Sequence, residues 1–404
     1  MTAKLTTLEN AALRTGLNVS DGHPRMPLTQ SQRAIVSGLG EMYDDALKLP
    51  FDELEAETHR AFLHGLGQYS APIGTGRLVS CYSSSVAIDL LARALAERTS
   101  QVAVIHPTFD NIPDLLKSRH LSLVPVSQHE LETGELRLPP ETGAVFATSP
   151  NNPTGWVASQ EQLERLAGWC AATGRILALD TCFRAHDQRA QYDTYRVLED
   201  SGVEWAVVED TGKLWPVLEL KAGFLSWGPH TSLPIADAFD DLLLSVSPLI
   251  LTLLTKLAQD AAAGGYTELR KLIAGNRAIL AEAIEGSGLA LKEPDSRISL
   301  AQVSLPPEAG PAAGVYQAML EQGIHVLPCG AFHWADPEGG ARDIRISLAR
   351  VPQEVRTAAT ALARAGRGGR GGRGGRGGRG GGEDAPPGAS PPDPSTGQGA
   401  AHDR

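Results

Sequence analysis

Residues 205–223 read WAVVEDTGKLWPVLELKAG. The first four form an apolar run of strand length, and a turn with small and polar residues follows. Lys213 lies in this turn directly after Gly212, and Lys221 follows eight residues later. This pattern predicts a buried strand that leads into a catalytic loop, where the amine of a lysine could form a Schiff base. Taken alone, the segment is also compatible with two surface lysines near a turn.

Strand-like and helix-like segments alternate before this stretch. Five apolar runs have the length of a strand: VSCY (79–82), VAVIHP (102–107), LSLVPV (121–126), AVFATS (144–149) and ILALD (176–180). Helical patterns such as SQEQLERLAGWCAATG (159–174) separate them. The alternation predicts an α/β fold with a mostly parallel sheet and helices on both faces. In such sheets, ligands bind at the carboxyl ends of the strands.

A different pattern follows Lys221. Residues 247–265 and 266–287 read as two long helices, and a smaller α+β unit comes after them. We therefore expect four parts. They are an N-terminal arm or lid (1–25), a small domain (26–45 with 266–364), a large domain that holds the site (46–265) and a tail (365–404).

Composition limits the class of protein. With 404 residues, of which 42% are hydrophobic and 21% charged, the chain can bury a large core. The first residues, MTAKLTTLENAALRTG, contain no apolar signal segment, so we expect a cytoplasmic protein. The four cysteines (Cys81, Cys170, Cys182 and Cys329) lack CxxC or ligand-like spacing, which predicts neither a metal site nor a disulfide framework.

The tail has a composition of its own. Residues 366–382 read GRGGRGGRGGRGGRGGG, and a Pro-rich segment follows. Nothing there can build a core, so we expect disorder. Arginine-glycine repeats can contact RNA, but no aromatic residue interleaves the arginines and the whole chain has a net charge of -11. The tail is therefore either a solvated linker or a weak contact for nucleic acid, which is not a main partner of the folded part.

Polar and aromatic residues lie just after the predicted strands. Ser84 and Ser85 open a helix, whose N-terminal N–H groups and dipole suit a phosphate, although serines there can be plain caps. Phe109 could stack on a flat ring or belong to the core. Asn152, in the turn SPNNPTG, could donate to a phenolic oxygen or only shape an Asn-Pro turn. Asp180 ends a buried strand, where a carboxylate needs a cationic partner.

With Lys213, the order and spacing of these residues resemble the fold type I aminotransferases that depend on pyridoxal 5'-phosphate. The resemblance covers roughly residues 20–360. It implies a Schiff base between Lys213 and the cofactor, with Asp180 keeping the ring nitrogen protonated so that the ring is an electron sink. The other implied contacts are Asn152 with the ring oxygen, Phe109 stacked on the ring, Cys182 among the cofactor-binding residues, Ser84, Ser85 and Lys221 with the phosphate, and Arg345 with the substrate carboxylate.

Three positions depart from that family. Lys221 stands where an arginine is common, Phe183 where a tyrosine is usual, and Asp210 where a serine often binds the phosphate. Because a carboxylate would repel a phosphate, we interpret Asp210 as facing a cationic substrate side chain. The lost hydrogen-bond donor at Phe183 should alter the electronics of the ring, which favours an atypical reaction.

Longer phrases resemble a narrower group, the pyridoxal-phosphate-dependent L-arginine hydroxylase/oxidases of bacterial natural-product pathways such as the enduracididine type. They include LNVSDGHPR, HPTFDNIPDLL, LALDTCFRAHD, EDTGKLWPVLELKAG and FHWADP. This resemblance implies that dioxygen oxidises free L-arginine, without metal or flavin, to 4-hydroxy-2-oxoarginine and 2-oxoarginine. The wider family implies a homodimer.

Matching to this group also assigns roles to the N-terminal arm. Thr6 and Glu9 lie one turn apart if residues 6–15 form a helix, and Glu9 with Asp210 would clamp the substrate guanidinium. Asp21 and His23 belong to the DGH segment, with Asp21 expected to bind substrate and His23 to position water or transfer a proton. We expect the arm to become ordered as a lid when arginine binds.

Three functions remain open from the sequence. The first is the arginine oxidase/hydroxylase, which Asp210, Glu9 and the DGH segment favour. The second is a conventional aminotransferase for a cationic amino acid, which would require a 2-oxo acid as amino acceptor. The third is a non-catalytic binding protein on the same fold, in which Lys213→Ala would change no chemistry.

Overall fold

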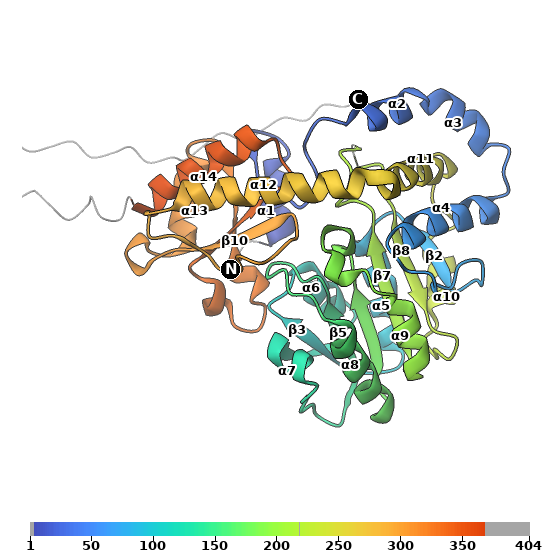
Figure 1. The fold of residues 1–404 in the computed structure, drawn as a ribbon. Helices are drawn as coiled ribbons and strands as arrows, with labels where there is room; N and C mark the ends of the chain where they lie inside the picture. Colours follow the sequence, from blue (N-terminus) through green and yellow to red (C-terminus); the bar gives the residue numbers. More distant parts are fainter. Residues whose placement is uncertain (1–3, 218, 368–404) are drawn as a thin grey trace, which may run out of the picture. The chain divides into compact units, whose positions relative to one another are not determined.

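The strand that leads to Lys213 lies inside a seven-stranded sheet with the order β2-β8-β7-β6-β5-β3-β4 (Figure 1). The computed structural model describes residues 4–217 and 219–367. The strands are β2 (Leu78–Cys81), β3 (Gln101–His106), β4 (Ser122–Ser127), β5 (Thr142–Thr148), β6 (Ile176–Asp180), β7 (Trp205–Asp210) and β8 (Gly223–Trp227). Strand β8 runs antiparallel to β2 and β7, and the pairs among β7, β6, β5, β3 and β4 are parallel. The predicted mostly parallel sheet is confirmed.

Both faces of this sheet are buried. On β3, Ala103 and Ile105 belong to one apolar core, whereas Val102 and Val104 belong to a second core on the opposite face. Strands β5, β6 and β7 divide their residues between the two cores in the same alternating way. Because helices cover both faces, these strands read as continuous apolar runs in the sequence.

Helices cover both faces of the large sheet. Helices α8 (Gln160–Ala172) and α9 (Thr194–Ser201) contribute to the first core, and α5 (Ser84–Ala96), α6 (Asn111–Ser118) and α10 (Ile235–Leu242) contribute to the second. The short α7 (Gln128–Thr133) follows β4. This arrangement leaves the carboxyl ends of the parallel strands at one edge of the sheet, where the connecting turns meet.

A smaller antiparallel sheet follows, with the order β12-β13-β10-β9. Its strands are β9 (Ala290–Leu291), β10 (Leu300–Ser304), β12 (Leu327–Pro328) and β13 (Asp343–Ser347). Helices α12 (Tyr266–Ile284) and α13 (Ala312–Leu320) pack against α14 (Pro352–Arg367). These elements form the smaller α+β unit that the sequence predicts. Strand β1 (Leu17–Asn18) pairs in parallel with β11 (Ile324–His325), which ties the N-terminal arm to this unit.

The helices near the N-terminus pack beside α11 (Pro248–Asp260). Residues 26–45, expected in the small domain, supply α2 (Gln30–Ser37) and most of α3 (Leu39–Ala46). Both pack against α11, as does α4 (Phe51–Gly65). The physical reason is apolar burial, because Met42 of α3 shares a core with Leu253 and Leu254 of α11. Figure 1 shows the same grouping.

The predicted boundary near residue 265 coincides with a change in backbone geometry. A π-helical turn, η3 (Ala261–Gly265), joins α11 to α12. Within it Gly264 has φ 148, which side chains disfavour and glycine tolerates. Helix α12 then runs from α11 to the smaller sheet (Figure 1). The arm, both sheets and their helices belong to one compact unit, so the division into separate domains stays a prediction.

A helix lies near each end of the described chain. The arm contains helix α1 (Leu5–Ala12). Helix α14 continues to Arg367, two residues beyond the predicted start of the tail at 365. The predicted disorder of the Arg/Gly-rich segment concerns residues 368–404, which lie outside the described residues. Within the described ranges, no helix combines the length and apolarity needed to cross a membrane.

Candidate active site

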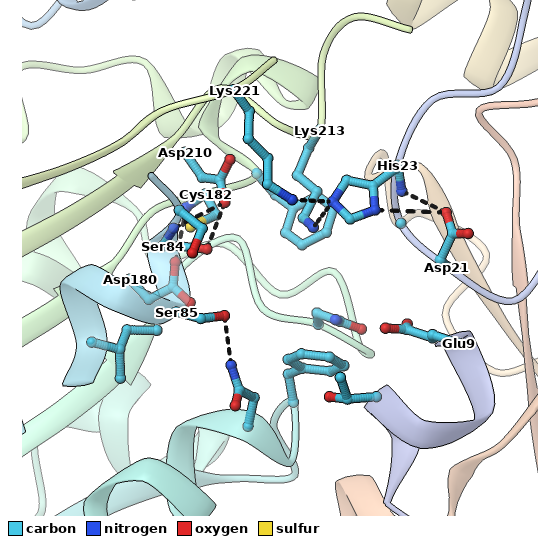
Figure 2. Close-up of a pocket in the computed structure, with 18 of the residues that line it drawn as sticks. Glu9, Asp21, His23, Ser84, Ser85, Asp180, Cys182, Asp210, Lys213 and Lys221 are labelled. Carbon is cyan, nitrogen blue, oxygen red and sulfur yellow. Dashed lines mark hydrogen bonds and ion pairs between the residues drawn. The ribbon is translucent and has the colours of Figure 1, made fainter. Parts of the chain in front are cut away.

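A cavity of about 430 Å³ lies at the carboxyl ends of the large-sheet strands and is partly covered by α1. Every residue predicted for the site lines it: Thr6, Glu9, Asp21, His23, Ser84, Ser85, Phe109, Asn152, Asp180, Cys182, Asp210, Lys213, Lys221 and Arg345. They come from the arm, from the large sheet with its turns and, for Arg345, from β13 of the small sheet, and Figure 2 shows how ten members from the first two groups lie. The structure therefore brings these residues together, and their individual roles stay predictions.

The N-terminus of α5 forms one end of the cavity. Ser83 is the N-cap, and its hydroxyl accepts a hydrogen bond from the amide of Val86. The Ser85 hydroxyl accepts from the side chain of Asn111 at 2.7 Å. Gly223, the first residue of β8, lies so close that a Cβ atom there would overlap the backbone of Ser83 and Ser84. Free N–H groups and hydroxyls at a helix N-terminus suit an anion such as phosphate.

Asp210 occupies this helix terminus, and its expected contact with a substrate side chain stays a prediction. Its carboxylate accepts hydrogen bonds from the Ser84 hydroxyl at 2.5 Å and from the amide of Gly212. The physical reason is that the helix N-terminus offers a carboxylate the same donors that it offers a phosphate. A phosphate bound at Ser84 would therefore have to displace Asp210, which would free that carboxylate for another cation.

Asp180 ends β6 at the bottom of the cavity. Burial raises the pKa of its carboxyl group, which accepts a hydrogen bond from the amide of Cys182 at 3.0 Å. Within residues 4–217 and 219–367, Asp180 forms no ion pair. Burial and then Asp180 raise the pKa of the Cys182 thiol well above its usual value, so this neighbour is neutral. The protonated nitrogen of a pyridine ring is the kind of partner that such a carboxylate lacks.

Lys213 and Lys221 converge on one imidazole nitrogen (Figure 2). The His23 Nε2 atom lies 3.5 Å from the Lys213 Nζ atom and 3.1 Å from the Lys221 Nζ atom. Asp21 and Glu219 face the other ring nitrogen, Nδ1, at 3.9 and 3.6 Å. Because ammonium groups only donate, Nε2 is the acceptor and Nδ1 carries the hydrogen. The charge of Lys213, burial and the charge of Lys221 lower the pKa of His23 to about 2.

His23 should therefore stay neutral throughout the physiological range. We expect its imidazole in cofactor-free protein to show no protonation between pH 5 and pH 8, because the two lysine charges oppose a third positive charge. Side-chain nitrogen NMR, assigned with the His23→Gln variant, measures this directly. A midpoint near 6.5, the ordinary histidine value, would contradict the geometry around Nε2.

Asp21 joins the arm to Arg350 and to the backbone of His23. Its carboxylate accepts hydrogen bonds from Arg25 at 3.0 and 3.1 Å, from Arg350 at 3.1 Å and from the amide of His23. Although burial acts in the other direction, the charges of Arg350 and Arg25 lower the pKa of Asp21. These contacts suit a positioning residue for His23, and the expected substrate contact of Asp21 stays a prediction.

Arg345, on β13, lies between the arm and the predicted ring site. Its guanidinium donates to the Asn152 side-chain oxygen at 3.2 Å, to Glu9 at 2.7 Å and to the Ser20 carbonyl at 2.5 Å. Because the Asn152 oxygen is used, its amide nitrogen is the group that can donate to a ring oxygen. Glu9 binds Arg345 and Asp210 binds Ser84, and the predicted clamp of Glu9 and Asp210 on a substrate guanidinium stays a prediction.

Sequence reasoning did not identify the residues that hold α1 in place. The amide of Leu5 donates to Asp110 at 2.8 Å, and Lys4 pairs with Asp114 at 2.8 Å. Leu5 is buried against Leu327, Cys329 and Phe332. Burial raises the pKa of Asp110 to about 6. Asp110 directly follows Phe109, but only the folded chain shows that this turn meets the arm.

The residues present fit pyridoxal 5'-phosphate. Lys213 supplies an amine, Asp180 a buried carboxylate without a cationic partner, and Asn152 an amide donor. Phe109 and Phe183 supply flat apolar surface beside the cavity, and Ser84, Ser85 and Lys221 supply donors for a phosphate. Asp210 is the one member of the phosphate end that must move.

Comparisons with known proteins agree with this fit. The sequence model of the family described as aminotransferase class I and II matches residues 17–362. A solved structure, described as MppP soaked with the product 2-ketoarginine, is 41% identical with a TM-score of 0.84. The match covers 87% of this chain and 100% of that chain.

More distant relatives share the fold. Aspartate aminotransferase from Thermus thermophilus, with maleate, has a TM-score of 0.74 at 18% identity, over 90% of this chain and 97% of its own. The aspartate aminotransferase of Geobacillus stearothermophilus is 27% identical over 115 residues, 26% of this chain. That match spans only 29% of the length of this curated relative.

Proposed function

Because this chain belongs to the aminotransferase class I and II family, we propose that it is an enzyme of that family that oxidises free L-arginine with dioxygen. The cofactor is pyridoxal 5'-phosphate, as in the family. The proposed products are 4-hydroxy-2-oxoarginine and 2-oxoarginine, with ammonia and reduced oxygen. We further propose a homodimer, as the family implies.

The bound cofactor supplies an electron sink next to the α-carbon of the substrate. Around it, Lys213 would hold the cofactor and move the α-proton of arginine. Asp180 would keep a proton on the ring nitrogen, since a buried carboxylate is stabilised by a cation beside it. His23 accepts hydrogen bonds at Nε2 and could orient water near the substrate, and it could take a proton only once the Lys213 amine is bound to the cofactor and its charge no longer opposes that of the imidazole.

The proposal of a cationic substrate rests on two carboxylates, those of Glu9 and Asp210. Arg345 would take the substrate carboxylate in a paired hydrogen bond, in competition with Glu9. Glu9 would then be free for the guanidinium at the other end of the substrate. Asp210, displaced from Ser84 by the cofactor phosphate, would be the second partner. The likeness to MppP, whose structure was soaked with the product 2-ketoarginine, supports an arginine-derived ligand.

A conventional aminotransferase for a cationic amino acid is the alternative. The matches to aspartate aminotransferases favour it at the level of the fold. It would use the same Arg345, Asp180 and Lys213, but it would need a 2-oxo acid to accept the amino group. The requirement for an acceptor therefore separates the two reactions.

Dioxygen uptake tests the proposal. The cofactor-loaded protein is given L-arginine without a 2-oxo acid, and the products are identified by mass spectrometry. We expect uptake with L-arginine and little with L-citrulline, whose neutral end offers no charge to Glu9 or Asp210. Absence of uptake, with amino transfer once a 2-oxo acid is added, would establish the aminotransferase instead.

The arm should act as the lid of this site. Arginine that contacts Glu9 would stabilise α1 over the cavity, so hydrogen exchange of amides 5–12 should slow when arginine is added. At about 100 times Kd, open forms should become up to roughly 100-fold rarer. Mass spectrometry of peptides from the arm measures the exchange, with peptides of α8 as the internal reference. Equal exchange of the arm with and without arginine would contradict the lid.

A further inference from the structure

A second cleft lies behind the Lys213 turn and has a volume of about 740 Å³. Four arginines line it: Arg189, Arg270, Arg277 and Arg297. Its walls come from the segment after β6, from α12 and from residues 294–297. We call it the arginine cleft. It shares no lining residue with the cavity that holds Lys213.

Helix α12 forms one wall through a single face. Arg270, Ala274, Arg277, Ala278 and Ala281 all line the cleft, and their spacing of three or four residues places them on one side of the helix. Arg270 and Arg277 are two turns apart, about 10 Å along the axis. The alanines leave room between the two long side chains. A ligand lying along this face would therefore meet both guanidinium groups.

The positive charge of the cleft is only partly neutralised. Asp187, which is fully buried, pairs with Arg189 at 2.6 Å and lies 3.8 Å from Arg297. By contrast, Arg270 donates to the carbonyl of Ala185, and Arg277 donates to the carbonyls of residues 298 and 300. Neither forms an ion pair within the described part of the chain. Burial lowers the pKa of Arg277 to about 10.

The charges around the cleft indicate the sign and the magnitude of the charge that a ligand would carry. Among the described residues one carboxylate, Asp295, lines the cleft, and the buried Asp187 contacts two of its arginines, Arg189 and Arg297. Four guanidinium groups and two carboxylates leave a net charge of about +2 at neutral pH. The excess is located at Arg270 and Arg277, whose hydrogen-bond acceptors among the described residues are backbone carbonyls, while Arg270 also lies over the Tyr266 ring.

Unsatisfied polar atoms give an independent sign of a ligand. Arg277 Nε, Ser296 Oγ and His186 Nδ1 are buried without a hydrogen-bond partner among the described residues. All three residues line the cleft, and His186 is only 1% exposed. Buried polar atoms nearly always have a partner, and leaving one unpaired is costly. Two of the three, the arginine N–H and the serine hydroxyl, are donors that an oxyanion would satisfy.

We propose that the arginine cleft binds a small oxyanion with two negative charges, of the phosphate or dicarboxylate type, on Arg270 and Arg277. The planar guanidinium fork matches both phosphate and carboxylate oxygens. Ser296 adds a hydroxyl donor at the small-sheet side of the cleft. The site lies outside the substrate cavity, so the proposal goes beyond the arginine oxidation proposed above and does not depend on it.

The cleft touches two segments that shape the cofactor site. His186 Nε2 bonds the carbonyl oxygen of Lys213 at 3.1 Å. On the other side, a Cβ atom at Gly155 would overlap Ser296 Oγ, so Ser296 packs directly on the turn that carries Asn152. An anion in the cleft would thus lie against the backs of the Lys213 turn and the Asn152 turn. We expect its binding to shift the absorbance of the bound cofactor.

Inorganic phosphate is the probe for the test. The full chain, loaded with cofactor so that its phosphate end is filled, is titrated by calorimetry at constant ionic strength. We expect saturable binding of one phosphate per chain, weakened roughly tenfold or more by Arg270→Gln and by Arg277→Gln. Lys271→Gln is the matched control, because Lys271 is exposed on the same helix, lies outside the cleft lining and removes the same charge.

Each outcome of this titration either supports or overturns the proposed anion site. Weakening in both arginine variants, with the control unchanged, supports the site, and displacement of phosphate by malonate extends it to dicarboxylates. Arg270 is less buried than Arg277, so Arg270→Gln keeps the test valid if Arg277→Gln fails to fold. Non-saturable uptake, or equal affinity in all variants, would mean an adventitious ion only and would overturn the proposal. Loss of arginine oxidation alone would not affect this readout.

Discussion

Replacing Lys213 with alanine should abolish dioxygen uptake with L-arginine. Among the described residues, two lysines line the cavity, Lys213 and Lys221. Lys213 is the one that lies in the turn after β7. Without its amine, the protein loses both the covalent attachment of the cofactor and the base for the α-proton. We expect a loss of roughly 10⁴-fold in rate. An oxygen electrode measures the rate, and the absorbance of the bound cofactor reports its attachment.

Lys271→Ala is the control for this substitution, because it removes an exposed lysine of α12 that does not line the cavity. Full activity in Lys213→Ala would refute the catalytic role of that lysine. No uptake and no cofactor absorbance in either protein would instead favour the interpretation of the fold as a binding protein. Loss of cofactor absorbance with an unchanged melting temperature would show that the effect is chemical rather than structural.

Arg345→Gln should cause the second largest loss. Arg345 is 1% exposed and joins Glu9, Asn152 and the Ser20 carbonyl in one network. Removing one partner of a buried charge pair costs about 2–5 kcal/mol, or roughly 30- to 5000-fold in kcat/KM. Because the carboxylate of the substrate would lose its partner, the preference for arginine over agmatine, which has no carboxylate, should also disappear.

Arg345→Lys separates charge from geometry. Lysine keeps the positive charge but cannot form the paired hydrogen bonds of a guanidinium. We expect an intermediate kcat/KM and partial recovery of the preference for arginine over agmatine. A thermal unfolding curve for each variant shows whether the fold survives. A folded Arg345→Gln protein that still prefers arginine over agmatine would contradict the proposed carboxylate contact.

The sequence predicts the large sheet well because helices cover both of its faces. Alternating residues such as Val104 and Ile105 are both buried, so a strand reads as an unbroken apolar run. Strand β8 is harder to recognise, since its five residues begin directly after the Lys213 loop. The local sequence pattern of α2 and α3 also does not predict where these helices lie. An amphipathic pattern shows that one face of a helix packs against another element, but it does not show which element.

The candidate site, like the fold, is predictable from the sequence only in part. The order of the residues after the strands, together with the family resemblance, predicts which side chains line the cavity. The present partners of Glu9, Asp21 and Asp210 are a tertiary property that the sequence does not show. The arginine cleft has no compact sequence motif, because its arginines lie on three separated segments. Only the folded chain shows that two of them lack a carboxylate.

The attachment of α1 has a practical consequence for handling the protein. Lys4 and Leu5 already contact Asp114 and Asp110 beside the cavity. A purification tag fused close to this end would place foreign chain beside the cavity. Tagged and untagged material could then differ in turnover because the tag disturbs these two contacts. A tag at the opposite terminus avoids a fusion next to Lys4 and Leu5.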